Sequence, residues 1–260
     1  MNPLIIKFGT GILAEPGGCA IDLAQIQRLA SEISTLIKQG IPCIIVSSGA
    51  IAAGVHALNL EKRPNDVAGK QACAAVGQPM LMATYAKEFA YHEVTTAQLL
   101  LTHEDIYTKS RRHNAQATLN HLLTSRHVIP IINENDSVAV EELRLGDNDQ
   151  LSAEVAVMMK ARLLILLTST DGLMTTLGGI PQQRIPLVTN LQDVLCHVTP
   201  EKGEHSTGGM ATKLKAVEVA TTAGIETIIA DGRKPQQIEK ALVGEDVGTR
   251  FIRPTGRIKV

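Results

Sequence analysis

Short apolar runs alternate with amphipathic stretches along the whole of this 260-residue sequence. The run LIIKF at 4–8 predicts a strand, and residues 22–39 then repeat apolar side chains at three- and four-residue spacing, which indicates one face of a helix. Further apolar runs lie at 42–48, 95–101, 127–132, 162–168 and 226–231, and further helical patterns lie at 67–90 and near 110–125, 149–160 and 212–223. This alternation predicts an α/β fold with a mainly parallel sheet covered by helices on both faces.

The ends of the first long helix carry recognisable signals. Asp22 is a suitable N-cap, Gln25 stands at the capping-box position, and Gly40 ends the helix. Farther along, GGIPQQRIP at 178–186 is predicted to be the loop that divides the chain into two lobes. Ligands of such sheets bind beyond the carboxyl ends of the strands, so the loops after the strands are where chemistry is expected.

The composition argues against several classes of function. Lys plus Arg is 25 and Asp plus Glu is 26, so the net charge of −1 offers no attraction to nucleic acid or to an anionic membrane. Trp is absent and aromatic residues make up 2%, so a base-stacking surface is not expected. The four cysteines lie far apart in the sequence, which is typical of free thiols in a reducing compartment.

The beginning of the sequence, MNPLIIKFGTG, enters a strand pattern at once, so no signal peptide is predicted. No apolar run approaches the roughly 20 residues that a membrane-spanning helix needs. We therefore expect a soluble cytoplasmic protein that binds neither nucleic acid nor membrane.

The loop after the first strand, KFGTGILA, formally matches a dinucleotide-binding pattern. The context opposes that interpretation, because EPGG at 15–18 breaks the helix that should follow, and the next strand ends in SSGA without an acidic residue for the ribose. Lys7 is a charge inside an otherwise apolar strand. Either its side chain reaches up to water, or Lys7 and the neighbouring Gly9 and Gly11 form a phosphate site.

Two other loops join a strand or a glycine pair to a helix. In VSSGAIAAG at 46–54, Ser48 is either an ordinary helix cap or, with the N–H groups of Gly49 and Ala50, part of a carboxylate site. In STGGMATKLKAVEVATTAG at 206–224, Lys213 lies in the first turn of a helix, where a cation is unfavourable by roughly 0.3–1 kcal/mol. A bound anion would reverse that cost, whereas a solvated surface lysine would simply tolerate it.

The stretch INENDSVAVEELRLGDNDQLSA at 132–153 gathers many carboxylates and amides after an apolar run. Glu141 and Glu142 belong to a predicted hairpin and are interpreted as solvated. Asp136 stands where the strand ends, and Asp149 precedes a predicted helix that it can cap. Two lysines, glycine-rich anion turns and a cluster of acceptors together are what phosphoryl transfer to a charged small molecule requires.

Six motifs, in this order and spacing, resemble the glutamate-phosphorylating branch of the amino-acid kinase family: KFGT, VSSGAIAAG, KQACAAVGQ, PIINENDSVA, GDNDQLSA and TGGMATKLKAVEVATTAG. The resemblance covers essentially the whole chain, and SGAIAAG, INENDSVA and GDND favour this branch over carbamate, uridylate and aspartate kinases. It implies a three-layer αβα sandwich and one kinase domain over 1–260, with glutamate bound by about 1–160 and nucleotide by about 161–260. The implied reaction is ATP-dependent, Mg²⁺-assisted phosphorylation of the γ-carboxylate of L-glutamate, the first step towards proline.

The resemblance also implies roles for individual residues. Lys7 and Lys213 would stabilise the phosphoryl group in transfer, Asp149 would orient both lysines, and Ser48, Asp136 and Asn148 would hold glutamate. The residues implied in nucleotide binding are Lys7, Gly9, Thr168, Ser169, Thr207, Gly208, Gly209, Met210, Ala211, Thr212 and Lys213. No residue is expected to bind a metal directly. Because the attacking carboxylate is already an anion, no general base is needed, and neither lysine is expected in the core.

The partners implied are L-glutamate, proline as a feedback inhibitor, further copies of the chain in a dimer or tetramer, and glutamyl phosphate reductase as receiver of the product. Family members usually read Thr-Asp where this chain has Thr168-Ser169, and Tyr-Thr-Ala-Asp-Pro where it has LMTTLGG. Many also carry a C-terminal RNA-binding-like domain, so the resemblance is to a short form. Two alternatives remain: a related kinase with another acceptor, and a catalytically silent amino-acid sensor, against which the retention of Lys7, Lys213 and Asp149 argues.

Overall fold

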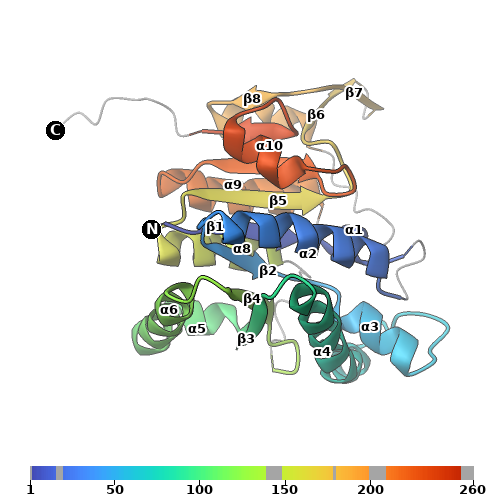
Figure 1. The fold of residues 1–260 in the computed structure, drawn as a ribbon. Coiled ribbons are helices and arrows are strands. Elements are labelled where there is room, and N and C mark those ends of the chain that lie inside the picture. Colours follow the sequence, from blue (N-terminus) through green and yellow to red (C-terminus); the bar gives the residue numbers. More distant parts are fainter. Residues whose placement is uncertain (1, 16–19, 139–147, 178–179, 199–208, 253–260) are drawn as a thin grey trace.

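The computed structural model describes residues 2–15, 20–138, 148–177, 180–198 and 209–252. The strands of the main sheet are β1 (Leu4–Phe8), β2 (Cys43–Val46), β3 (Thr95–Leu101), β4 (Val128–Glu134), β5 (Leu163–Thr168), β8 (Leu187–Val188), β9 (Thr227–Asp231) and β10 (Thr249–Phe251). Within the described chain they form one eight-stranded sheet in the order β3-β4-β2-β1-β5-β9-β10-β8 (Figure 1). Its neighbours are parallel except where β10 meets β9, which confirms the predicted mainly parallel sheet.

Helices cover both faces of this sheet. They are α1 (Thr10–Leu13), α2 (Leu23–Lys38), α3 (Ala50–Ala57), α4 (Val67–Ala90), α5 (His103–Tyr107), α6 (Lys109–Leu123), α8 (Asn148–Met159), α9 (Met210–Thr222), α10 (Gln237–Val243) and the 3₁₀ helix η1 (Leu191–His197). Figure 1 shows α2 and α10 on one face and α8 and α9 on the other. The long helices lie where the periodic patterns predicted them, and none of the described helices has the length and apolar character that a membrane crossing requires.

The segment 178–186 is not the loop that its Gly and Pro content predicted. Within it, Ile180–Arg184 forms β7, which pairs antiparallel with β6 (Met174–Leu177) in a separate two-stranded sheet. The Thr175 hydroxyl supports the pairing, since it donates to the Gln183 carbonyl at 3.2 Å and accepts from the Gln183 N–H at 3.1 Å. Pairing with a neighbouring strand has thus outweighed the local turn signal. The hairpin predicted around Glu141 and Glu142 lies outside the described residues.

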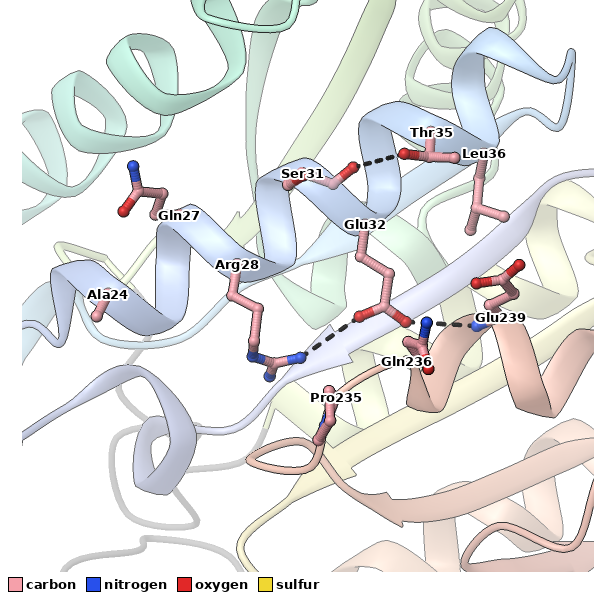
Figure 2. A pocket seen from close by; sticks show the side chains of 10 residues that line it. All are labelled: Ala24, Gln27, Arg28, Ser31, Glu32, Thr35, Leu36, Pro235, Gln236 and Glu239. Carbon is pink, nitrogen blue, oxygen red and sulfur yellow. Dashed lines mark hydrogen bonds and ion pairs between the residues drawn. The ribbon is translucent and has the colours of Figure 1, made fainter.

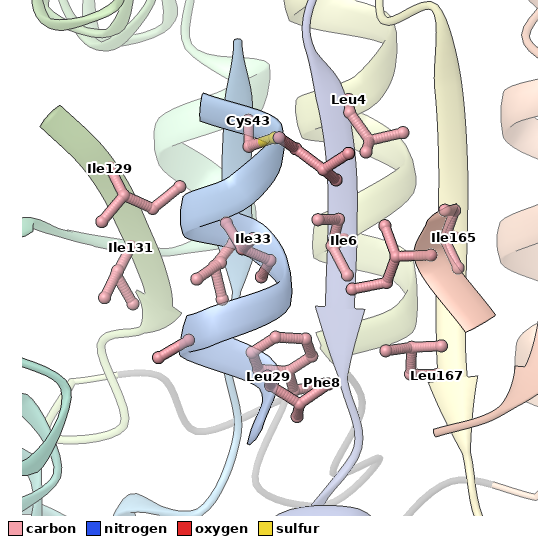
Figure 3. Close-up of a cluster of buried hydrophobic side chains, with 14 of the residues drawn as sticks. Leu4, Ile6, Phe8, Leu29, Ile33, Cys43, Ile129, Ile131, Ile165 and Leu167 are labelled. Atoms are coloured by element: carbon pink, nitrogen blue, oxygen red, sulfur yellow. The ribbon is translucent and has the colours of Figure 1, made fainter. Parts of the chain in front are cut away.

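Strand β1 divides the core in two, because successive side chains point to opposite faces. Leu4, Ile6 and Phe8 join a cluster that α2 covers, in which Leu29 and Ile33 lie over the sheet (Figure 3). The alternate position Ile5 belongs to a second cluster on the other face, with residues of α8 and α9. Both faces are apolar along most of β1, and its one charged side chain, Lys7, lies near the end of the strand.

Helix α2 also holds the connection from β9 to α10. Asp22 caps the helix as predicted, accepting from the Gln25 N–H at 2.9 Å. The Gln25 side chain does not complete a capping box. It donates instead to the carbonyl of Gly232 at 2.6 Å, so a tertiary contact has replaced the local one. A cavity of about 440 Å³ lies between α2 and α10 (Figure 2). Beside it, Glu32 accepts the N–H of Ile238 at 2.9 Å.

Helices α3 and α4 touch backbone to backbone. A Cβ at Gly54 would come within 1.8 Å of the carbonyl oxygen of Cys73, and a Cβ at Gly77 within 1.9 Å of the carbonyl oxygen of Ala50. Neither contact leaves room for any side chain. The two glycines therefore fix α4 against the first turn of α3, which follows strand β2. The thiols of Cys43, Cys73 and Cys196 are free, as predicted, and Cys19 lies outside the described residues.

Candidate active site

Lys7 occupies the face of β1 on which α8 and α9 pack. It shares this face with Ile5, two residues earlier, and stands one residue before the strand ends. Its side chain is buried, with 5% of the residue exposed, so it does not reach up to water. The strand pattern alone left both interpretations open, and the structure supports a buried charge with a fixed partner.

That partner is Asp149, which also contacts Lys213. Nζ of Lys7 lies 2.6 Å from Oδ1 of Asp149, and Nζ of Lys213 lies 3.1 Å from Oδ2 of the same carboxylate. Helix α8 carries Asp149 in its first turn and α9 carries Lys213 as its fourth residue, so the packing of the two helices on one face of the sheet assembles the group. We call Lys7, Asp149 and Lys213 the charged triad.

The positions of the triad residues correct two expectations. Both lysines are in the interior, with Lys213 7% exposed and Asp149 fully buried, although neither lysine was expected in the core. Burial is tolerated because each ammonium contacts a carboxylate oxygen, and an unpaired buried charge would be far more costly. Asp149 does not precede α8 as a cap would, since the helix begins at Asn148. Two cations against one anion leave the triad with a formal charge of +1.

Glycine turns border the triad on two sides. Gly9 is the N-cap of α1 without a side-chain cap bond, and a Cβ added to it would lie 3.3 Å from the carbonyl oxygen of Leu167 and 3.7 Å from Nζ of Lys7. Gly209 is likewise the N-cap of α9 without a side-chain cap bond. Helix α1 ends after four residues, which agrees with the predicted break and with the rejection of a dinucleotide fold. Backbone N–H groups at such helix starts are suited to anions.

The structure brings most of the predicted nucleotide residues to this edge. Thr168 ends β5 next to β1, and the following Ser169 is close to the first glycine turn, because a Cβ at Gly11 would lie 3.5 Å from Oγ of Ser169. Met210, Ala211 and Thr212 form the first turn of α9 ahead of Lys213, and the hydroxyl of Thr212 donates to the carbonyl of Gly209 at 2.8 Å. Thr207 and Gly208 lie outside the described residues.

Asn148 and Ser48, two of the three residues predicted to hold the acceptor substrate, are in direct contact. Nδ2 of Asn148 lies 3.1 Å from Oγ of Ser48 and 2.7 Å from the carbonyl oxygen of Ser47. Asn148 directly precedes Asp149 in α8, so this contact adjoins the charged triad. Ser48 leads into Gly49, which has a left-handed φ of 103° and starts α3 without a side-chain cap bond. Of the two interpretations left open for Ser48, the ordinary helix cap therefore does not hold.

Asp136, the third of these residues, lies in the turn that follows β4 and lines a cavity of about 480 Å³. The cavity is also lined by Gln78, Gln98 and Glu134. Arg63 is its charged neighbour: burial lowers the pKa of the Arg63 guanidinium, and the negative charge of Asp136 acts in the opposite direction. One hydrogen bond joins Asn148 to Ser48, whereas Asp136 belongs to the wall of this cavity.

Two residues of the site have no role in the sequence-based prediction. Asn133, near the end of β4, accepts from Nδ2 of Asn148 at 2.9 Å, and Gln78 of α4 accepts from Nδ2 of Asn133 at 2.8 Å. The available signal was a polar residue at the end of an apolar strand and a glutamine beside a helix glycine. Among the described residues, no group of three His, Cys, Asp or Glu side chains is arranged to hold a metal ion.

Comparison with known proteins agrees with this geometry. Residues 2–231 match the amino acid kinase family. Glutamate 5-kinase from Clostridium acetobutylicum is 43% identical over 256 residues, which are 97% of this chain and 95% of that protein. Glutamate 5-kinase from Gloeobacter violaceus is 42% identical over the whole of this chain and 71% of its own length. The corresponding enzyme from Thermus thermophilus is 44% identical over 95% of this chain and 66% of its own length.

Solved structures with lower sequence identity share the fold. UMP kinase from Bacillus anthracis superposes with a TM-score of 0.63 at 14% identity and covers 98% of this chain and 97% of its own. N-acetylglutamate synthase from Neisseria gonorrhoeae superposes with a TM-score of 0.65 at 16% identity over 97% of this chain and 61% of its own. The sandwich architecture implied by the motifs is thus confirmed, and the chain belongs to the amino acid kinase family.

Proposed function

We propose that this chain transfers the γ-phosphoryl group of ATP to the γ-carboxylate of L-glutamate, giving L-glutamyl 5-phosphate, the first step towards proline. The observation that carries the proposal is the charged triad beside the contact between Asn148 and Ser48. The identity of about 42–44% to glutamate 5-kinases over 95% or more of this chain supports the choice of substrate.

The chemistry of the reaction matches a buried excess of positive charge. A carboxylate that attacks a phosphate is already an anion, so the main obstacle is the approach of two negative groups. Lys7 and Lys213 lie where charge would develop on the transferred group, and Asp149 holds both ammonium groups in place before the substrates arrive. Donors fixed in advance of the reaction lower the barrier because they need no reorganisation.

The glycine turns account for the nucleotide side of the proposal. The N-terminal N–H groups of α1 and α9, next to Gly9 and Gly209, would hold phosphate oxygens, and Thr168 and Ser169 would border the nucleotide. Mg²⁺ would be bound chiefly by the phosphates, with water as its remaining ligands, and would neutralise phosphate charge. On this proposal the part from about 161 onward binds most of the nucleotide, the turn at Gly9 adds contacts to its phosphates, and the rest of the first 160 residues or so binds glutamate.

The acceptor side is proposed to hold glutamate by its amino-acid head. The N–H groups at the start of α3 and the hydroxyl of Ser48 suit the α-carboxylate, while Asn148 and Asp136 offer acceptors to the ammonium. This arrangement would set the distance from the head to the triad. Aspartate, one methylene shorter, would leave its carboxylate on the order of 1 Å short of the phosphate, and a misplacement of that size costs about 10²-fold in rate.

Release of ADP from MgATP by the purified chain, measured against a panel of acceptors, tests the proposal. We expect turnover that requires both L-glutamate and Mg²⁺, with aspartate slower by about 10²-fold. Hydroxylamine in the assay should trap the acyl phosphate as a hydroxamate, which identifies the product as a carboxyl phosphate. Equal turnover with aspartate, carbamate or a nucleoside monophosphate would make the chain a kinase with another acceptor. Binding of glutamate without ADP release would indicate a silent sensor.

A further inference from the structure

A chain of neutral amides runs through the interior from β3 to α8. Nε2 of Gln78 donates to Oε1 of Gln98 at 2.8 Å, and Nδ2 of Asn133 donates to Oε1 of Gln78 at 2.8 Å. Nδ2 of Asn148 in turn donates to Oδ1 of Asn133 at 2.9 Å. Every link points the same way: Gln98 accepts from Gln78, Gln78 from Asn133, and Asn133 from Asn148. We call Gln98, Gln78, Asn133 and Asn148 the amide chain.

The direction of the amide chain is set by backbone groups that have a single role. The N–H of Glu134, which can only donate, lies 2.9 Å from Oδ1 of Asn133, and this fixes that atom as the acceptor. The carbonyl of Ser47, which can only accept, lies 2.7 Å from Nδ2 of Asn148. With Nδ2 of Asn148 turned to Ser47, Asn133 and Ser48, the group that Asn148 can offer to a ligand is Oδ1, an acceptor.

Burial makes the inner links of the amide chain difficult to replace. Asn133 is 2% exposed, so the donor that it directs at Gln78 has little access to water. Gln78 is held in position by its neighbour Gly77, whose contact with the backbone of Ala50 fixes this part of α4. Gln98, by contrast, is exposed at the edge of the sheet, where water can take the place of a lost partner.

We propose that Gln78 is a positioning residue for the amino group of the substrate. It holds Asn133, and through Asn133 it holds the Asn148 amide with Oδ1 turned towards the substrate. An acceptor at this point suits a donor on the ligand, and the α-ammonium of an amino acid is such a donor. An analogue without the amino group would form no hydrogen bond with it. The inference rests on the proposed function, because it assigns one contact of the glutamate head.

The test compares the affinities for glutamate and glutarate, a dicarboxylate of the same length without the ammonium, by calorimetry. Gln78→Met keeps the volume of the side chain but cannot accept from Asn133. We expect its glutamate affinity to fall about tenfold, as for one lost hydrogen bond to a charged group, while its affinity for glutarate stays the same. In turnover, the KM for glutamate should rise by the same factor, while kcat and the KM for ATP remain near those of the parent.

Three further variants keep the test independent of folding. Gln78→Ser is too short to reach Asn133, and the cavity beside it allows a shorter side chain, so it should reproduce the loss seen with Gln78→Met. Gln78→Glu retains an acceptor for Asn133 and should keep the ratio of the two affinities within about threefold of the parent. Gln98→Met alters the exposed end of the amide chain and should leave the ratio unchanged.

The outcomes separate this inference from the function on which it rests. A parent chain that binds neither glutamate nor glutarate overturns both. If the parent prefers glutamate and Gln78→Met and Gln78→Ser keep its full preference, or lose affinity for both ligands equally, Gln78 does not position Asn148. A loss in Gln98→Met as large as that in Gln78→Met would also overturn the inference, since it would trace the effect to the packing of α4 on the sheet edge.

Discussion

The charged triad and the amide chain both reach the start of α8, where Asn148 and Asp149 are adjacent, yet one cluster is ionic and the other neutral. In the triad, two lysines share one buried carboxylate, and the three groups together carry a formal charge of +1. In the amide chain, three hydrogen bonds link the four neutral side chains and no member carries a charge. The triad is thus suited to growing negative charge, and the amide chain to fixing which atom meets the ligand.

The largest effect is expected where the triad loses its anion. Asp149→Asn keeps the shape but removes the carboxylate that both buried lysines contact, so stability should fall by about 3–5 kcal/mol, as when a buried pair loses one partner. Turnover should fall by about 10²-fold or more because the lysines lose their common anchor. Urea unfolding and ADP release measure the two effects. If the variant keeps both the stability and the turnover of the parent, the two lysines do not need the negative charge of Asp149. The triad would then work as the amide chain does, through neutral contacts.

The next largest effect concerns the lysines one at a time. Lys7→Met and Lys213→Met each remove a cation from the proposed transfer site, so kcat should fall by about 10²-fold or more. Lys215→Met, two residues along α9 and exposed, is the matched control and should be silent. Single-turnover kinetics would separate chemistry from product release. If either variant keeps the kcat of the parent, the lysine that it replaces has only a structural role.

An intermediate effect is expected where α4 is pressed against α3. Gly77→Ala places a Cβ within 1.9 Å of the Ala50 carbonyl oxygen, so α4 must move, at a cost of about 1–3 kcal/mol. Because Gln78 moves with it, the KM for glutamate should rise while the KM for ATP changes little. Val76→Ala, at an exposed neighbouring position, is the control. Equal changes in both KM values would mean that the amide chain and the triad respond as one unit.

The smallest effect is expected at Glu32, which lines the cavity between α2 and α10 and belongs to neither the triad nor the amide chain. Burial raises the pKa of Glu32 above its ordinary value of 4.5, although the N–H groups of Ile238 and Glu239 and the charge of Arg28 lower it in part. A raised carboxyl pKa contributes stability that is present below about pH 4.5 and is lost as the pH rises through the folded-state value. Glu32→Gln lacks this loss, so its free energy of unfolding should gain on the parent between pH 4 and 7. A constant difference across that range would contradict the prediction.

Much of the fold follows from local pattern. The strand at 4–8 and the helix at 67–90 have the limits that the sequence predicted, because each is a periodic apolar segment whose ends carry turn or cap signals. Predictions from a local turn or cap signal were wrong where a contact with a residue distant in sequence overrode that signal. Segment 178–186 was predicted to be a loop, but part of it pairs with β6 as a strand. Gln25 was placed at a capping-box position, but its side chain donates to the carbonyl of Gly232 instead.

The sequence by itself determined six strands of the main sheet, the longer helices and the residue types of the site, since periodicity and motif spacing are local properties. It missed the shorter elements, among them β7 and β10. It placed Lys7, Lys213 and Asp149 as candidates but wrongly kept both lysines out of the core. Only the tertiary structure decided that α8 and α9 pack on the Lys7 face of β1, and that Gln78 reaches Asn148 through Asn133. Burial and hydrogen-bond direction depend on neighbours that are far apart in sequence, so these were settled by the way the helices pack on the sheet.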